Sequence, residues 1–159
     1  MRVHVYVGRG GRLMLLPYED EEEENRSILR FTVRREGDAI VVGPDDKLPK
    51  DLPPERVFAY GTLTDPETVA SVVGRVPYMV YPAVLEGYEL ALEDVGNRYN
   101  TVREKEGSRV SGTLLVGLSE EELREVDRYE GYPVLYERRR ERVETPLGEV
   151  GAYVYVARE

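Results

Sequence analysis

One glutamate near the end of a predicted helix is well placed to do acid–base chemistry. Residues 120–130 predict a helix with Ser119 as its N-cap. At about 100° per residue, Glu130 falls within roughly 60° of Leu123 and Val126, on the apolar side of this helix. A carboxylate there lies at the negative end of the helix dipole and partly out of water, and both conditions raise its pKa. A carboxylate with a raised pKa can take up and release protons near neutral pH.

The same position has a second interpretation. Glu130 is a last-turn residue, so its side chain can fray outward into solvent. It can also pair with one of three consecutive basic residues further along the chain, Arg138, Arg139 and Arg140. Helical spacing alone does not separate these interpretations from a catalytic role.

A second candidate lies between an apolar run, residues 57–60, and a predicted helix over about 65–73. Gly61-Thr62-Leu63 presents consecutive backbone amides just before that helix. Glycine lets a backbone approach a ligand closely, and such amides can hold a carboxylate or the oxygen of a tetrahedral intermediate. A plain connection between strand and helix explains the stretch as well. It lacks the GxxxxGK[ST] pattern of a phosphate-binding loop.

Composition excludes several other chemistries. The 159 residues include no Cys, so thiol catalysis, disulfides and thiolate metal sites are absent. The one histidine, His4, lies in an alternating apolar run and is interpreted as a strand residue without a chemical role. The net charge of −9 argues against general nucleic-acid binding. We expect no metal or organic cofactor.

The chain shows neither an apolar run long enough for a membrane span nor a signal-peptide pattern. We therefore expect a cytoplasmic protein that does not bind membranes. The abundance of Glu and Arg suits a heat-adapted protein. Mostly charged residues over 136–142 suit an exposed sheet edge and favour a monomer.

The elements that must position these residues predict an α+β fold. Residues 1–50 are expected to form a β-rich appendage with an acidic loop at 19–24 and a Pro-rich linker, followed by a domain over 51–159. The loop is expected to be solvated; binding of a metal or a basic partner is the alternative. In the appendage, residues 13–16 are expected to pair with the strand 2–8, and residues 28–35 and 39–42 are expected to form a β-hairpin. The strands expected in the domain are 57–60, 80–85, 87–93, 109–118, 134–144 and 149–157. Residues 94–108 are expected to be irregular and to end in a turn at 106–108.

The order and spacing of several blocks resemble the gamma-glutamylcyclotransferase-like family, including its plant avirulence-induced branch. The resemblance covers residues 57–157. It runs through the blocks VFAYGTLTDPETVASVVGRVP, PAVLEGYEL, VSGTLLVGLSEEELREVDRYEG, YERRRERV and AYVYV.

The resemblance implies a small mixed β-barrel with short flanking helices and a cavity at its mouth. It also implies a reaction in which the substrate's α-amine attacks its own γ-glutamyl carbonyl, giving 5-oxoproline and a free amine. Carried over to this sequence, the general acid/base is Glu130. The substrate-binding residues are Tyr60, Gly61, Thr62, Leu63 and Tyr136.

The sequence departs from the family pattern in two places. Asn97-Arg98-Tyr99-Asn100 stands where the family often has a Tyr-Pro pair, and we expect these residues to bear on substrate choice. The spacer GYPVL between Glu130 and Tyr136 is longer than in some branches. The expected partner is a small γ-glutamyl compound. The alternatives are a binding protein of the same fold that does no chemistry, and an interaction module that uses residues 1–50.

Overall fold

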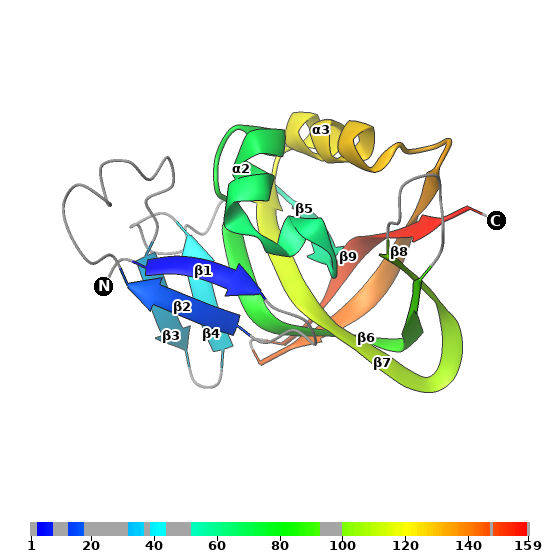
Figure 1. Ribbon diagram of the computed structural model, residues 1–159, viewed down its shortest axis with the longest axis horizontal. Coiled ribbons are helices and arrows are strands. Elements are labelled where there is room, and N and C mark those ends of the chain that lie inside the picture. The colour runs from blue at the N-terminus through cyan, green and yellow to red at the C-terminus, as the bar shows by residue number, and fades with distance from the viewer. Residues whose placement is uncertain are drawn as a thin grey trace.

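Five strands close into a barrel in the computed structural model, which describes residues 3–7, 13–17, 32–36, 39–43, 52–92, 100–146 and 148–158 (Figure 1). The strands are β5 (Glu55–Ala59), β6 (Tyr78–Leu92), β7 (Asn100–Leu118), β8 (Tyr136–Thr145) and β9 (Gly148–Ala157). They pair in the order β6-β7-β5-β9-β8. The last strand, β8, also pairs with the first, β6, where Val84 lies opposite Glu144, and this pairing closes the barrel. β5 and β9 run parallel, while the other barrel pairs are antiparallel. The predicted small mixed barrel is confirmed.

Two short helices lie on one side of this barrel, α2 (Pro66–Val73) and α3 (Glu120–Glu130) (Figure 1). α3 begins with the predicted capping box. The Ser119 hydroxyl accepts from the Glu122 amide at 3.1 Å, and the Glu122 carboxylate accepts from the Ser119 amide at 3.0 Å. It ends at Gly131, whose φ of 79° is the left-handed conformation that glycine adopts without a side-chain clash.

The N-terminal strands form two hairpins, as predicted. β1 (Val3–Val7) pairs with β2 (Leu13–Pro17), and β3 (Thr32–Glu36) pairs with β4 (Ala39–Gly43). β4 also pairs with β6, so the second hairpin extends the barrel sheet to seven strands. The acidic run 19–24 lies outside the described residues, and the division of the chain at residues 50 and 51 stays a prediction.

The prediction that residues 94–108 are irregular is wrong for residues 100–108. β7 begins at Asn100, and Thr101, Val102, Arg103 and Glu104 pair with the end of β6. The expected turn at 106–108 is a bulge, where the register shifts between Glu86 and Tyr88. Gly87 and Gly107 both have positive φ there, 81° and 83°. A charged, glycine-containing stretch therefore indicated a turn where the two strands only bend and continue. Residues 93–99 lie outside the described part of the chain.

Apolar side chains form two clusters. One fills the barrel and includes Phe58, Leu85, Val102 and Val154. The other joins the helices to the outside of the barrel and includes Leu63, Val69, Leu115, Leu123 and Val126. Gly112 lets β5 and β7 approach closely, because a Cβ there would lie 2.2 Å from the Ala59 carbonyl oxygen.

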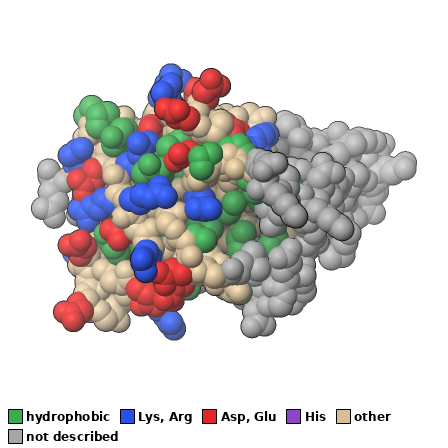
Figure 2. Space-filling view, turned by 180° about the vertical axis from the view of Figure 1, so that it is seen from behind, with side chains coloured by type: hydrophobic (Ala, Val, Ile, Leu, Met, Phe, Trp, Pro, Cys, Tyr) green, Lys and Arg blue, Asp and Glu red, His purple; other side chains and the backbone are tan. Residues whose placement is uncertain are grey.

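The surface is mixed in charge. On the face shown in Figure 2, basic side chains stand beside acidic ones over much of the described area. No helix in the described ranges is both long and apolar enough to cross a bilayer.

Candidate active site

Glu130 is the last residue of α3 and lies on the side of the helix that packs against the barrel. Leu123 and Val126, which share its face, are both buried, as the helical spacing predicts. The Glu130 side chain is half-buried. The helix ends with its carbonyl dipoles pointing toward this residue, so the local field disfavours a negative charge.

Burial raises the pKa of the Glu130 carboxyl from 4.5 to about 7. No described residue gives this carboxylate a hydrogen bond or an ion pair that would lower the value again. The three arginines considered as partners are engaged elsewhere. Arg138 pairs with Asp127, Arg139 pairs with Glu137, and Arg140 lies over the Tyr153 ring.

The Gly61-Thr62-Leu63 stretch lies beside the end of α3. The stretch forms a short 3-10 turn, η2 (Thr62–Thr64). The Thr64 amide and the Thr64 hydroxyl both donate to the Gly61 carbonyl oxygen, at 3.1 and 2.6 Å, and these two hydrogen bonds close the turn. The Thr62 hydroxyl is hydrogen bonded to the Tyr129 hydroxyl at 2.6 Å, so the turn contacts the residue next to Glu130.

The backbone of this turn is open to a ligand. Among the described residues, none accepts a hydrogen bond from the amides of Gly61, Thr62 or Leu63, as expected for the first amides of a helical turn. Gly61 is exposed, and a Cβ added to it would meet nothing within 4 Å. The Leu63 side chain is 3% exposed and anchors the turn in the apolar cluster under the helices.

Tyr60 and Tyr136 complete the group of sequence-predicted residues. The Tyr60 hydroxyl donates to the Tyr155 carbonyl oxygen at 2.5 Å. Its pKa is raised, mainly by burial, and the nearby charges of Glu130 and Tyr136 add to the rise. Tyr136 is 2% exposed in the cluster under the helices. The fold thus gathers Glu130, Tyr60 and Tyr136 around one point.

A polar network fixes the last turn of α3 to the barrel. Asp127, one turn before Glu130, accepts two hydrogen bonds from Arg138 Nη1 at 2.9 and 2.6 Å. It also accepts one from the Tyr155 hydroxyl at 2.5 Å. The Arg138 guanidinium lies over the rings of Tyr132 and Tyr153, 4.9 and 4.5 Å from their centroids. Asp127, Arg138 and Tyr155 therefore tie α3 to β8 and β9.

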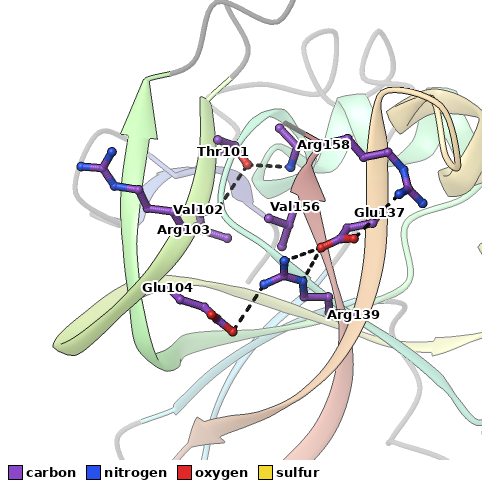
Figure 3. Close-up of a pocket in the computed structure, with 9 residues that line it drawn as sticks. Thr101, Val102, Arg103, Glu104, Glu137, Arg139, Val156 and Arg158 are labelled. Carbon is purple, nitrogen blue, oxygen red and sulfur yellow. Dashed lines mark hydrogen bonds and ion pairs between the residues drawn. The ribbon is translucent and has the colours of Figure 1, made fainter.

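A pocket of about 520 Å³ opens at the adjacent end of the barrel (Figure 3). Its charged lining comes from three strands, with Arg103 and Glu104 on β7, Glu137 and Arg139 on β8, and Arg158 just after β9. Val154 and Val156, the β9 partners of Arg139 and Glu137, belong to the cluster that fills the barrel. Because directly paired residues share a face of the sheet, the side chains of Glu137 and Arg139 point to the inside of the barrel.

The resemblance implied a cavity at the mouth of the barrel, but the sequence interpretation named neither the charged residues that line this pocket nor the network around Asp127. A signal for the network was present, because the β8–β9 turn sets a register that places Arg138 opposite Tyr155. Residues 97–99, expected to bear on substrate choice, lie outside the described residues. Within the described ranges, no group of three His, Cys, Asp or Glu side chains is arranged to hold a metal ion.

Comparison with known proteins gives consistent matches. The family model described as gamma-glutamyl cyclotransferase, AIG2-like, matches residues 57–159. A Methanocaldococcus jannaschii protein named gamma-glutamylcyclotransferase and putative RNase is 35% identical over 104 residues, 63% of this chain and 45% of that protein. AIG2-like protein C of Arabidopsis thaliana is 35% identical over 74 residues, 46% of this chain and 42% of that protein. The matched region thus spans less than half the length of these curated relatives.

Solved structures show the same fold. An Arabidopsis thaliana protein determined in solution is 29% identical, with a TM-score of 0.59 over 70% of this chain and 66% of that one. A structure named gamma-glutamyl cyclotransferase has a TM-score of 0.59 over 66% of this chain and 67% of that one. At 18% identity, the second similarity speaks for the fold alone.

Proposed function

Because the chain belongs to the AIG2-like gamma-glutamyl cyclotransferase family, we propose that it converts γ-glutamyl compounds into 5-oxoproline and a free amine, with Glu130 as general acid and base. The proposal rests on the state of the Glu130 carboxyl group. This group is half-buried, has no partner among the described residues, and has a pKa of about 7. A binding protein has no use for a carboxylate held in that state, whereas a proton-transfer catalyst works best with a pKa near the working pH.

The chemistry needs two proton transfers through Glu130. Glu130 takes a proton from the substrate's α-ammonium, and the freed amine attacks the γ-carbonyl carbon to form the five-membered ring. Glu130 gives this proton to the leaving nitrogen, and the γ-amide carbon–nitrogen bond breaks as the γ-carbonyl re-forms. The ring nitrogen, which carries two protons after the attack, loses one of them, and the released amine takes up that proton as an ammonium group. Because both reacting groups belong to one molecule, holding it in a bent conformation supplies much of the acceleration.

The turn after β5 has a complementary role. The free amides of Gly61, Thr62 and Leu63 hold the substrate's α-carboxylate or the oxyanion that forms at the γ-carbonyl. Tyr60 stays protonated at working pH because its pKa is raised. Its hydroxyl therefore shapes the site as a hydrogen-bond donor and does not act as the base.

The test is a panel of γ-glutamyl compounds, with 5-oxoproline measured by mass spectrometry. The wild type should form product, and Glu130→Gln should lower turnover by about a hundred- to ten-thousandfold, the usual contribution of a general acid–base group. Glu121→Gln, an exposed position in the first turn of the same helix, is the matched control and should keep full activity.

Two outcomes would contradict this assignment. Normal turnover by Glu130→Gln would show that Glu130 is not the general acid and base. Binding of the panel compounds by the wild type without formation of product would show that the protein is a binding protein of the same fold.

The predicted monomeric state is checked separately by light scattering.

A further inference from the structure

The pocket at the end of the barrel carries more guanidinium groups than carboxylates, although the chain as a whole is acidic. Three arginines line it, Arg103, Arg139 and Arg158, against two acids, Glu104 and Glu137. The net charge of the whole chain is −9. A local positive balance inside a concave site in such a chain favours an anionic ligand group.

Two lining arginines keep hydrogen-bonding capacity, and Arg158 is the less exposed of them. Among the described residues, Arg103 donates only from its Nε, to Glu89, and its side chain is 66% exposed against 46% for Arg158. The Arg158 Nε donates to the Pro133 carbonyl at 2.5 Å, and its Nη1 lies 3.9 Å from Glu137, beyond hydrogen-bond distance. No described residue accepts a hydrogen bond from its two Nη atoms. Arg139 is more fully engaged, because it donates to Glu137 and, at 3.4 Å, to the Tyr88 hydroxyl. Figure 3 shows the guanidinium groups of Arg139 and Arg158 on opposite sides of the Glu137 carboxylate.

The pocket lies next to Tyr60, whose hydroxyl group is also close to Glu130. Thr101 and Val102 line the pocket, and both also form hydrogen bonds with the Tyr60 hydroxyl. These hydrogen bonds lower the pKa of Tyr60, but burial raises it by more. Val156, another lining residue, directly follows Tyr155, whose carbonyl accepts from Tyr60. Tyr60 therefore adjoins both Glu130 and the lining of this pocket, which makes the pocket the neighbouring site for the part of a substrate beyond its glutamyl group.

Resting on the proposed function, we propose that this pocket binds the leaving group of the γ-glutamyl substrate and that Arg158, with Arg139 across Glu137 from it, selects leaving groups that carry a carboxylate. The two free Nη atoms match the two oxygens of a carboxylate, an arrangement in which arginine forms paired hydrogen bonds. A volume of about 520 Å³ accommodates an amino acid or a short peptide. Simple amines would leave the two Nη atoms of Arg158 without a hydrogen-bond acceptor.

The test compares γ-glutamyl-alanine with γ-glutamyl-ethylamine, which differ only by the carboxylate on the leaving group. The wild type should prefer γ-glutamyl-alanine in kcat/KM by at least about tenfold, the scale of one charged hydrogen bond. Arg158→Gln should reduce this preference about tenfold or more, and Arg158→Lys should restore part of it. Glu104→Gln removes an acid from the rim and should increase the preference.

The control is Arg142→Gln, at an exposed arginine further along β8 that pairs with Glu149, and it should leave the preference unchanged. Equal kcat/KM for the two compounds in the wild type, or an unchanged ratio in Arg158→Gln, overturns the inference while the proposed reaction stands.

If the wild type converts neither compound, the proposed function fails for them, and titration calorimetry then tests the pocket directly. Tighter binding of γ-glutamyl-alanine that is lost in Arg158→Gln supports the selection by Arg158. Equal or undetectable binding of both compounds overturns it.

Discussion

At the scale of single residues, the Glu130 carboxylate is held in a state that opposes folding stability. Its pKa is about 7 in the folded chain and near the ordinary 4.5 in the unfolded chain. Between these values the folded chain keeps the proton that the unfolded chain has lost, so rising pH favours unfolding. The glutamine in Glu130→Gln stays neutral at every pH. Relative to wild type, this variant should therefore gain about 2 kcal/mol in the free energy of unfolding between pH 5 and pH 8.

Urea denaturation at both pH values measures this difference. Glu121→Gln removes a carboxylate from the exposed side of the same helix and should follow the wild type at both. Parallel pH dependence of the Glu130→Gln and wild-type curves would mean that Glu130 titrates as an ordinary surface carboxyl.

Residue-level features were predictable from the sequence where they depend on one element. The apolar face of α3 follows from helical spacing, and it correctly placed Leu123 and Val126 in the core beside Glu130. The partners of Tyr60 and Asp127 were not predictable in this way. The Tyr60 hydroxyl reaches a carbonyl 95 positions along the chain, and such a contact exists only once the barrel has closed.

At the scale of elements, the C-terminal turn of α3 depends on the bond between Asp127 and Arg138. The two side chains are 14% and 21% exposed, so the pair is well shielded from water. Asp127→Asn removes the charge that holds Arg138 and loosens the turn that buries Glu130. Water then reaches the Glu130 carboxylate, and its pKa falls toward the ordinary value. The acid limb of the pH profile of kcat/KM should move to lower pH by about one unit.

Glu125→Gln is the matched control for this prediction, because Glu125 forms an exposed ion pair with Arg128 on the same helix. Its pH profile should coincide with that of the wild type. Asp127→Asn could lower stability without changing the profile; that result would give Asp127 a structural role with no effect on Glu130.

The ends of an element were predictable where nearby residues in the sequence set them, as capping residues do. The prediction failed where pairing with a distant strand sets them. The Ser119 capping box and Gly131 fix both ends of α3 from sequence alone. Residues 100–104 are strand because the end of β6 lies beside them, and no local signal in Arg103, Glu104 and Lys105 indicates this. Pairing across a bulge thus overrode a composition that is typical of a turn.

At the scale of the whole molecule, the N-terminal hairpin β3–β4 shares a core with the barrel. Val41 on β4 is fully buried and belongs to the cluster that fills the barrel, and its strand neighbours pair with Met79 and Tyr81 on β6. A hairpin that contributes to the barrel core should unfold together with it, even though composition suggested a separate unit over residues 1–50. The prediction is that Val41→Ala lowers the free energy of unfolding of the entire barrel by about 1–3 kcal/mol, from lost apolar burial and the cavity left behind.

Val134→Ala provides the control, because Val134 is 77% exposed and the same two methyl groups are lost there without a cavity. Denaturation followed by tyrosine fluorescence and by far-ultraviolet circular dichroism should show one shared transition, shifted in Val41→Ala and unshifted in Val134→Ala. Most of the described tyrosines lie in the barrel and the adjoining helix, so their fluorescence reports on that part of the chain. An unshifted tyrosine transition in Val41→Ala would show that β4 docks on a barrel already stable without it, and residues 1–50 would then be an independent appendage.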